Sequence, residues 1–245
     1  MKRAVFTVAL AGPDGAGKST ITRRLEKVLP FPSKYVYMGV NLESSNLVLP
    51  TTRLLLEVKR ALGGRPDIAG PVDPNKSKHR PKSWTQRVFK GLKSSLRLTN
   101  QIAEEWFRQL LVWQYQRRGF IVLFDRHFYY DYYFHDVAVD DLQRSLVSRI
   151  HGHMLERFYP KPDFVIFLDA PAELLYARKR EGSVDILDHR RREYLRLREI
   201  VKNSVLVDAS QSEDDVLKEV ACQIMTFYHY GANAVSILEA ENIQT

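Results

Sequence analysis

The stretch "VALAGPDGAGKSTITRRL", residues 8 to 25, decides the fold because it joins an apolar run to a helical pattern through a glycine-containing loop. Within it, "GPDGAGKS" (residues 12–19) fits the pattern G-x-x-x-x-G-K-S/T. If a buried strand precedes this loop and a helix follows it, the backbone N–H groups of the loop and of the first helical turn point at one centre. The stretch therefore predicts a binding site for the phosphates of a nucleotide.

The side chains of the loop have separate expected roles. Gly15 and Gly17 permit a close approach of the backbone to the phosphates, and Lys18 places a positive charge on the β- and γ-phosphates. The hydroxyl of Ser19 can reach Mg²⁺. The cofactors expected are thus ATP and Mg²⁺, and the predicted nucleotide-binding residues are Gly12, Asp14, Gly15, Ala16, Gly17, Lys18, Ser19 and Thr20.

Five short apolar runs alternate with longer helical patterns along the chain. Strands alternating with helices predict a five-stranded parallel sheet with right-handed crossovers and helices on both faces. Ser212, with Asp215 three residues later, is a capping signal for the last helix, and Pro171 opens another. The expected strands span residues 4–10, 34–40, 120–125, 163–170 and 204–210, and the expected helices span 18–29, 100–118, 140–159, 172–179, 188–202 and 212–228.

The strand "FIVLFD" ends with Asp125, and Arg126 follows it directly. In phosphate-loop proteins, an Asp at the end of a strand beside the first strand commonly holds Mg²⁺ or its waters, which makes Asp125 the second expected metal-site residue after Ser19. An Arg at the same edge places a guanidinium near an anionic acceptor. Asp169 also ends a strand, where a capping or packing role is at least as good an interpretation.

Length and composition predict a single domain over residues 1–245, with 44% hydrophobic residues and 27% charged residues. No apolar run reaches the roughly 18 to 20 residues of a membrane-spanning helix. The run "AVFTVAL" could be taken for a signal peptide, but it has only seven residues. It also continues directly into the phosphate loop, which should stay attached to the protein. The single cysteine, Cys222, cannot form a disulfide within the chain. The sequence therefore predicts a cytoplasmic protein.

The net charge of +8 is concentrated in one segment, because residues 51–97 hold 12 Lys/Arg and only 3 acidic residues. The rest of the chain holds 25 basic and 26 acidic residues. We treat residues 41–99 as a basic insertion after the second strand, with an irregular stretch at 63–83 that contains four prolines and three glycines. The insertion has four interpretations: a solvated loop, an anion trap over the acceptor site, contact with an anionic or membrane surface, or nucleic-acid binding.

Four motifs occur along the chain in this order: "GPDGAGKST", "RRGFIVLFDRH", "PDFVIFLDAPAELLYARKREGSVD" and "VLVDASQSEDDVLKEV". They comprise the phosphate loop, the strand with its Asp-Arg-His end, the turn after the fourth strand with a lid at 177–187, and the last strand and helix. Together they resemble the thymidylate kinase family of nucleoside monophosphate kinases. The resemblance covers residues 5–37 and 100–228, and it is specific because the four motifs agree in order and spacing.

The resemblance implies specific roles and a homodimer. Asp14 would accept a hydrogen bond from a hydroxyl of the phosphoryl acceptor, Arg126 would hold the acceptor's phosphate, and Asp125 would organise the metal. The phosphate loop has no arginine, which implies that the lid supplies that charge, from Arg178, Lys179 or Arg180. The expected catalytic residues are Lys18, Asp125, Arg126 and, among the lid residues, Arg178.

The sequence departs from the family around the acceptor. It has "YVYMGVNLESS" where the family has a Thr-Arg-Glu-Pro turn, and counting back from Gly119 puts Glu104 and then Arg108 near the place of the family's base-binding arginine. After Asp-Arg-His the segment "FYYDYYFHD" is crowded with aromatic residues, at least half of which we expect in the core. His135 and Asp136 could line the acceptor pocket, whereas His151 and His153 receive no function.

The function expected from these observations is ATP- and Mg²⁺-dependent phosphoryl transfer to a nucleoside monophosphate, with dTMP one candidate. A second hypothesis keeps the kinase chemistry with a phosphorylated or lipid-linked sugar as acceptor. A third, of another class, is a nucleotide-dependent module that binds a polyanion through residues 51–97. Acceptor-dependent release of ADP separates the enzyme from the module.

Overall fold

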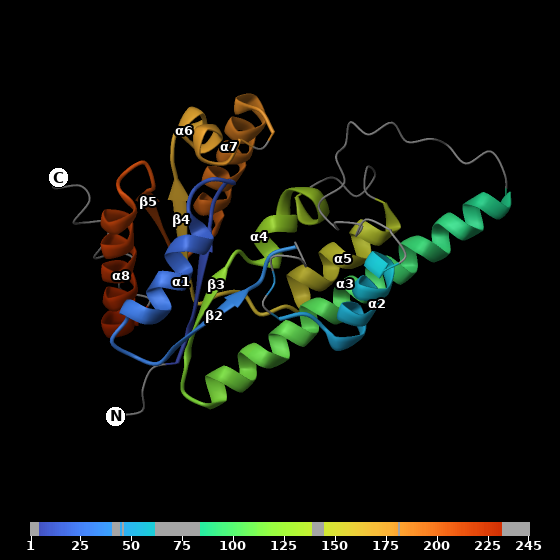
Figure 1. Cartoon of the computed structure of the whole chain (residues 1–245), viewed down its shortest axis with the longest axis horizontal. Helices are drawn as coiled ribbons and strands as arrows, with labels where there is room; N and C mark the ends of the chain where they lie inside the picture. The colour runs from blue at the N-terminus through green and yellow to red at the C-terminus, as the bar shows by residue number, and fades with distance from the viewer. Residues whose placement is uncertain are drawn as a thin grey trace.

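A five-stranded sheet lies at the centre of the protein, whose computed structural model describes residues 5–40, 45, 47–61, 84–138, 145–180 and 182–231. All strands are parallel, in the order β2-β3-β1-β4-β5, and the five predicted strands are confirmed (Figure 1). The apolar runs form strands because helices bury their side chains on both faces. The strands are β1 (Thr7–Ala11), β2 (Ser33–Tyr37), β3 (Ile121–Asp125), β4 (Phe164–Asp169) and β5 (Ser204–Asp208).

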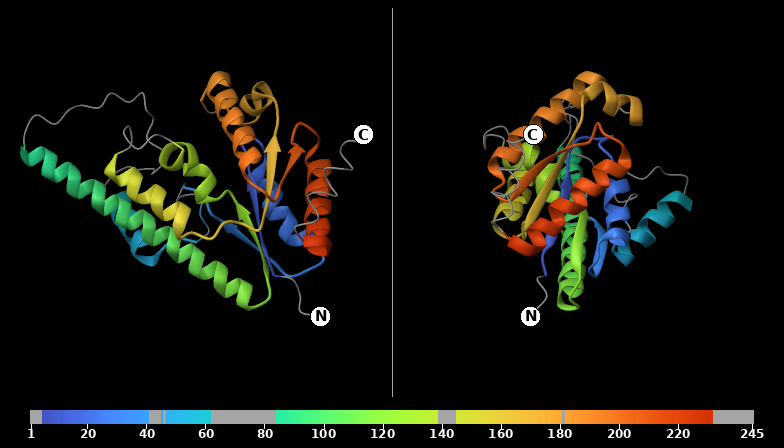
Figure 2. Two further views of the ribbon diagram at one scale, coloured as in Figure 1. Left: turned by 180° about the vertical axis from the view of Figure 1, so that it is seen from behind. Right: turned by 90° about the vertical axis from the view of Figure 1, so that its left-hand side faces the viewer.

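Helices cover both faces of this sheet (Figure 2). Alternate residues of each strand enter two separate core layers: Val8 and Leu10 of β1 pack towards α1 and α8, whereas Ala9 and Ala11 pack towards α3, α4 and α5. The helices are α1 (Lys18–Val28), α2 (Pro50–Ala61), α3 (Trp84–Arg117), α4 (Phe128–Tyr132), the π-helical turn η2 (Tyr133–Val137), α5 (Leu146–Arg157), α6 (Ala172–Lys179), α7 (Val184–Ile200) and α8 (Glu213–Tyr230).

The structure differs from the predicted helices in several places. The helix expected at 140–159 is α5, which begins at Leu146 after its N-cap Ser145. The helix expected at 100–118 begins at Trp84, so α3 is one helix of 34 residues that extends away from the sheet (Figure 1). The run after Arg126 forms α4 and η2, for which no helix was expected, because an almost unbroken aromatic run hides the helical period.

The predicted cap of the last helix is confirmed. Ser212 caps α8, its Oγ accepting a hydrogen bond from the backbone N–H of Asp215 at 3.3 Å. The helix expected at 188–202 is α7, which begins four residues earlier, at Val184, so the segment predicted as a lid, 177–187, includes the end of α6 and the start of α7. Of the basic insertion, α2 and the first part of α3 are described, and the irregular stretch 63–83 lies outside the described residues.

Strand register places the chemistry at one edge of the sheet. Leu10 of β1 pairs with Asp125 of β3 on one side and with Ile166 of β4 on the other. The phosphate loop after β1 therefore lies beside Asp125, in the crevice at the carboxyl ends of the central strands, where ligands bind in open α/β sheets. Within the described ranges, no helix combines the length and apolar character that crossing a membrane requires.

Candidate active site

The phosphate loop turns sharply between β1 and α1 with three glycines at positive φ. Gly12, Gly15 and Gly17 have φ values of 139°, 88° and 86°. A Cβ atom on Gly12 would overlap the carbonyl oxygen of Leu168, and one on Gly15 would lie 2.6 Å from the carbonyl oxygen of Leu175. Glycine is required here because the loop packs directly against the backbone of β4 and α6.

We expect Gly12→Ala to lower the free energy of unfolding by roughly 3 kcal/mol, because strained backbone and overlap with a main-chain oxygen add together. The matched control is Gly17→Ala, whose Cβ would meet only Ile21 Cγ1 at 4.0 Å. Its cost should be about 1 kcal/mol, from the positive φ alone. Urea unfolding of the two variants measures the difference, and equal losses would contradict the close contact with Leu168.

Lys18 begins α1 and is buried, with 4% of its surface exposed. Its Nζ donates to the carbonyl oxygens of Gly12 and Pro13 at 2.7 and 2.6 Å. Burial and the nearby guanidinium of Arg126 lower the pKa of Lys18 to about 7, against the attraction of carboxylates such as Asp14. The amine is thus held inside the loop by two of the loop's own carbonyl oxygens.

Asp125 and Ser19 could hold a metal ion. Asp125 is fully buried at the end of β3, and Tyr35 donates a hydrogen bond to its Oδ2 at 2.9 Å. Its Oδ1 has no hydrogen-bond partner among the described residues, and Ser19 is exposed at the start of α1. A buried carboxylate oxygen without a partner is costly, and Mg²⁺ or one of its waters would satisfy it. These two residues fit the predicted metal.

Arg126 is held in a strained conformation between two carboxylates. Its φ is 67°, its Nη2 forms an ion pair with Asp14 Oδ1, and its Nη1 lies 4.0 Å from Asp131 Oδ1. Burial opposes its charge, yet Asp131 and Asp14 raise the pKa of Arg126 well above its usual value. A Cβ atom on Gly39 would lie 2.6 Å from Arg126 Cδ, so the glycine leaves room for this side chain. Residues in such conformations cluster at functional sites.

Asp14 gathers three cations from three elements. Besides Arg126, it accepts a hydrogen bond from Arg190 Nη1 at 2.8 Å, and Lys179 Nζ lies 3.6 Å away. Burial raises the pKa of Asp14, but Lys18 and Arg126 reverse this effect and bring it well below its usual value. The carboxylate is therefore ionised, and it joins the phosphate loop to α6 and α7.

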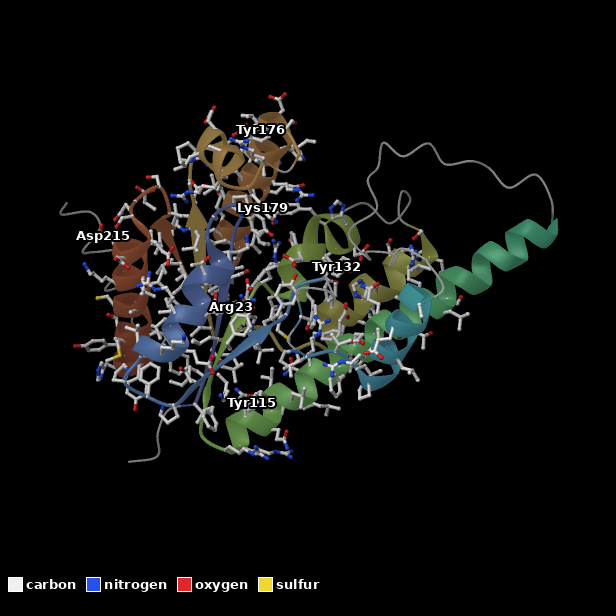
Figure 3. The ribbon with its side chains drawn as sticks, in the orientation of Figure 1. Arg23, Tyr115, Tyr132, Tyr176, Lys179 and Asp215 are labelled. Carbon is white, nitrogen blue, oxygen red and sulfur yellow. The ribbon has the colours of Figure 1, made fainter. Side chains whose placement is uncertain are left out.

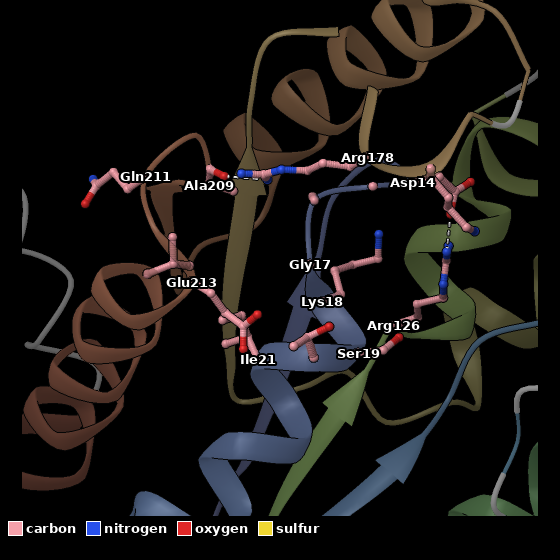
Figure 4. Close-up of a pocket in the computed structure, with 15 residues that line it drawn as sticks. Asp14, Gly17, Lys18, Ser19, Ile21, Arg126, Arg178, Ala209, Gln211 and Glu213 are labelled. Atoms are coloured by element: carbon pink, nitrogen blue, oxygen red, sulfur yellow. Dashed lines mark hydrogen bonds and ion pairs between the residues drawn. The ribbon is translucent and has the colours of Figure 1, made fainter. Parts of the chain in front are cut away.

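Two cavities meet at these residues. The first, about 400 Å³, lies between the phosphate loop and the turn before α8, and the second, about 300 Å³, lies between the loop, α4, η2 and α7. Both are lined by Asp14, Ser19, Arg126 and Lys179. Figure 4 shows the first cavity, with Arg126 and Asp14 on one side and Ala209, Gln211 and Glu213 on the other. The arrangement can hold two ligands end to end across the phosphate loop.

The structure places the three predicted lid cations, Arg178, Lys179 and Arg180, in different surroundings. Arg178 lines the first cavity, but its Nη1 donates to the carbonyl oxygen of Ala209 at 2.7 Å and it points away from Arg126 (Figure 4). Lys179 is directed to Asp14, whereas Arg180 is the exposed left-handed cap of α6. Arg190 of α7, which was not among the predicted site residues, is the third cation that contacts Asp14. Of the three lid candidates, the structure brings only Lys179 to Asp14.

The aromatic run is mostly core, as expected. Four of its residues are buried against the sheet, with exposures of 2 to 7%: Phe128, Tyr129, Tyr130 and Tyr132. Tyr130, Phe134 and His135 line the second cavity, but Asp136 does not. Asp169, for which packing was one interpretation, forms a two-pronged ion pair with Arg191 at 2.7 and 2.8 Å, which joins β4 to α7.

Arg108 does not line either cavity. Its side chain donates to the carbonyl oxygens of Gly39 at 2.8 Å and Leu47 at 3.2 Å, and it lies over the ring of Phe128. Glu104 accepts from the backbone N–H of Leu49 at 3.1 Å. Both residues brace the segment after β2, and neither lines one of the two cavities described above.

The comparisons with known proteins agree with the motifs. No family model matches the chain. A curated protein from Archaeoglobus fulgidus described as a probable thymidylate kinase is 30% identical over 122 residues, which cover 47% of this chain and 59% of that protein. The chain thus matches less than two thirds of the length of this relative.

Among solved structures, a deoxyadenosine kinase from M. mycoides aligns with 90% of this chain and 99% of its own, at 16% identity and a TM-score of 0.48. The phosphate loop, the parallel sheet and the curated match rest on separate observations that point the same way. The resemblance drawn from the motifs is confirmed: the chain has the fold of a phosphate-loop kinase and is similar to the nucleoside monophosphate kinases of the thymidylate kinase type.

Proposed function

We propose that the protein transfers a phosphoryl group from ATP, with Mg²⁺, to a nucleoside monophosphate. The observation that carries the proposal is the pair of cavities that share Asp14, Ser19, Arg126 and Lys179. A phosphoryl transfer needs a donor and an acceptor whose phosphates meet in line, with positive charge around the point of meeting. The donor would occupy the first cavity and the acceptor the second.

The donor side uses the phosphate loop. The N–H groups of the loop and the amine of Lys18 would bind the β- and γ-phosphates, and Lys18 would exchange its bonds to Gly12 and Pro13 for bonds to the nucleotide. Ser19 and Asp125 would hold Mg²⁺, which, when bound, neutralises charge on the transferring phosphoryl group. Gln211 and Glu213 lie at the far end of the cavity, where the nucleoside part of the donor would fit.

The acceptor side uses Arg126 and Asp14. The guanidinium of Arg126 would bind the acceptor's phosphate, and Asp14, ionised and held in place, would accept a hydrogen bond from one of its hydroxyls. Tyr130 and Phe134 offer rings against which a base could pack. A sugar phosphate would satisfy Arg126 equally well, which keeps a phosphorylated or lipid-linked sugar as the second candidate acceptor.

The lid would supply the remaining charge. Lys179 of α6 and Arg190 of α7 already lie against Asp14, at the boundary between the cavities. Mobile cations that close over a phosphoryl group stabilise charge in the transition state and help to exclude water. We propose these two residues for that role, and Arg178, bonded to Ala209, as a residue of the donor cavity.

Substitution separates these two lid roles. We expect Arg190→Ala to lower kcat by about 10²-fold, because one charge-stabilising donor is lost from the transition state. Arg178→Ala should raise the KM for ATP severalfold with a smaller effect on kcat, since its partner Ala209 lies at the donor end. Steady-state kinetics of the two variants test this assignment, which would be reversed if Arg178→Ala had the larger effect on kcat.

The proposed function is tested by ADP release with ATP and Mg²⁺ against a panel of nucleoside monophosphates and phosphorylated sugars, with products identified by mass spectrometry. We expect a nucleoside diphosphate from at least one monophosphate, dTMP included in the panel. Conversion of a sugar phosphate alone would favour the second candidate. ATP binding without any acceptor-dependent ADP release would favour the nucleotide-dependent polyanion-binding module.

The basic segment 51–97 and self-association stay predictions. Contact with an anionic or membrane surface would use this segment, whose side chains are described only in part. Salt-sensitive binding to anionic vesicles or oligonucleotides tests it, and sedimentation tests the homodimer.

A further inference from the structure

A buried histidine on α5 lies between two carboxylates from different elements. His151 Nδ1 is 2.7 Å from Asp136 Oδ2 of η2, and His151 Nε2 is 3.1 and 3.2 Å from the two carboxylate oxygens of Glu105 on α3. His151 and Glu105 are 1% and 3% exposed. Gln101 of α3 and the ring of Tyr132 of α4, edge-on at 4.8 Å, complete its surroundings (Tyr132 is labelled in Figure 3). The histidine joins three helical elements at one point.

The geometry favours a charged ring. A neutral imidazole donates from one nitrogen only, whereas here each nitrogen lies within hydrogen-bond distance of a carboxylate oxygen, so the doubly protonated ring is the form that donates to both carboxylates. The amide of Gln101, 3.1 Å from the same Nε2, donates to Glu105 at 3.2 Å. Burial by itself lowers the pKa of His151, but the hydrogen bonds to Asp136 and Glu105 more than reverse this and raise it to about 9. Burial also raises the pKa of Tyr132 well above its usual value, so its hydroxyl does not titrate in the same range.

The element that His151 holds forms a wall of the acceptor cavity. Asp136 belongs to η2, a single π-helical turn closed by a hydrogen bond from Ala138 N–H to the carbonyl oxygen of Tyr133 at 2.8 Å. The two residues before Asp136, Phe134 and His135, line the cavity. A π-helical turn is a less stable conformation than the α-helix around it and needs support from its surroundings. The ion pair with His151 supplies that support.

A second part of the cavity wall, at Val40, is also fixed to α3. Arg108, one turn after Glu105 on α3, donates to the carbonyl oxygen of Gly39, and the next residue, Val40, lines the acceptor cavity. Both walls that depart from the thymidylate kinase pattern are therefore braced on α3 by buried charged groups. This combination points to α3 as the support that sets the shape of the cavity.

We propose that His151 is a positioning residue of the acceptor site: clamped between Glu105 and Asp136, it fixes η2 so that Phe134 and His135 face the acceptor. The part of this inference that names the cavity as the acceptor site rests on the proposed function. The effect of His151 on η2 does not depend on it. The residue touches no substrate and acts through the turn that it holds.

Hydrogen exchange tests the support of η2 without any substrate. In His151→Gln, Asp136 and Glu105 lose a cation, and we expect protection of amides in residues 128–138 to fall about tenfold or more, whereas residues 12–19 keep theirs. The matched control is His153→Gln, two residues along α5 and exposed, which should leave both segments unchanged. Glu105→Gln, a second and milder variant, should show a smaller loss in the same segment. Unchanged protection of residues 128–138 in both His151→Gln and Glu105→Gln would overturn the proposal.

The pH dependence of the wild-type protein gives an independent check. The pKa of His151 is raised above its ordinary value of 6.5, so the stabilisation is fully present below that pH and is lost as the pH rises through about 9. Protection factors of residues 128–138 should fall over this range in the wild type and stay flat in His151→Gln. A flat wild-type profile would contradict the charged clamp.

Kinetics connect the clamp to the acceptor. His151→Gln should raise the KM for the acceptor about tenfold while the KM for ATP changes less than twofold. A general loss of folded protein would instead lower kcat and leave both KM values unchanged, and that pattern would count against a positioning role. If the wild type uses no acceptor at all, the proposed function fails, and the exchange comparison still decides whether His151 holds η2.

Discussion

Replacing Lys18 with methionine is expected to lower kcat for ADP formation by about 10³-fold, because the substitution removes a positive charge from the transferring phosphoryl group. Lys18 is buried, and its Nζ is bonded to the carbonyl oxygens of Gly12 and Pro13 inside the phosphate loop. Methionine keeps much of the length and volume of the side chain, which limits the effect on stability. The measurement is steady-state ADP release at saturating ATP and acceptor.

The matched control for this variant lies on the same helix. Lys27, in the last turn of α1, is exposed, and Lys27→Met should retain wild-type kcat within twofold. Thermal unfolding of both variants separates loss of chemistry from loss of fold. A kcat for Lys18→Met within tenfold of the wild type would mean that the amine does not reach the phosphates, and the donor assignment would have to be withdrawn.

The strands were predictable because each one is buried on both faces. Such a strand is mostly apolar, as in "FVIFL" at Phe164–Leu168, and this signal depends on local composition alone. The phosphate loop was predictable because its motif lies within residues 12–19, even though the close contacts of Gly12 and Gly15 are with the distant backbone of β4 and α6. Both signals can be recognised within a short stretch of sequence.

The lid shows why side-chain partners were less predictable. Arg190, Arg191 and Arg192 follow one another on α7, yet they pair with Asp14, Asp169 and Asp188 respectively. Successive helix residues point about 100° apart, so identical neighbours reach the phosphate loop, the end of β4 and the helix's own surface. Which one faces the active site depends on how α7 packs, and the sequence alone gave no reason to choose Arg190.

The clamp at His151 was invisible for a stronger reason. Its partners are 46 and 15 residues away in sequence, on elements whose packing had to be known first. His151 and His153 look alike in the sequence, but one is buried between carboxylates and the other is exposed. The π-helical turn η2, to which Asp136 belongs, was not predicted at all, so no sequence pattern could connect it to α5.

Arg126→Lys is expected to lower kcat/KM for the acceptor by about 10² to 10³-fold while leaving the affinity for ATP within twofold. The planar guanidinium of Arg126 pairs with Asp14, lies 4.0 Å from Asp131 and lines the second cavity with several N–H donors. A lysine at this position would have a single amine for all of these interactions. The acceptor's phosphate would lose its paired hydrogen bonds. Arg117→Lys, at the exposed end of α3, is the matched control and should behave as the wild type.

The ion pair between Asp14 and Arg126 makes the expected loss non-additive. Asp14→Asn alone should reduce kcat/KM for the acceptor, since it frees Arg126 from a fixed position and removes a hydrogen-bond acceptor. Once Arg126 is lysine, however, Asp14 has less to position, so the double variant should lose less than the product of the two single losses. Full additivity would mean that Asp14 and Arg126 act on the acceptor independently. An equal rise in the KM for ATP and for the acceptor in Arg126→Lys would place this arginine on the donor side of the site instead.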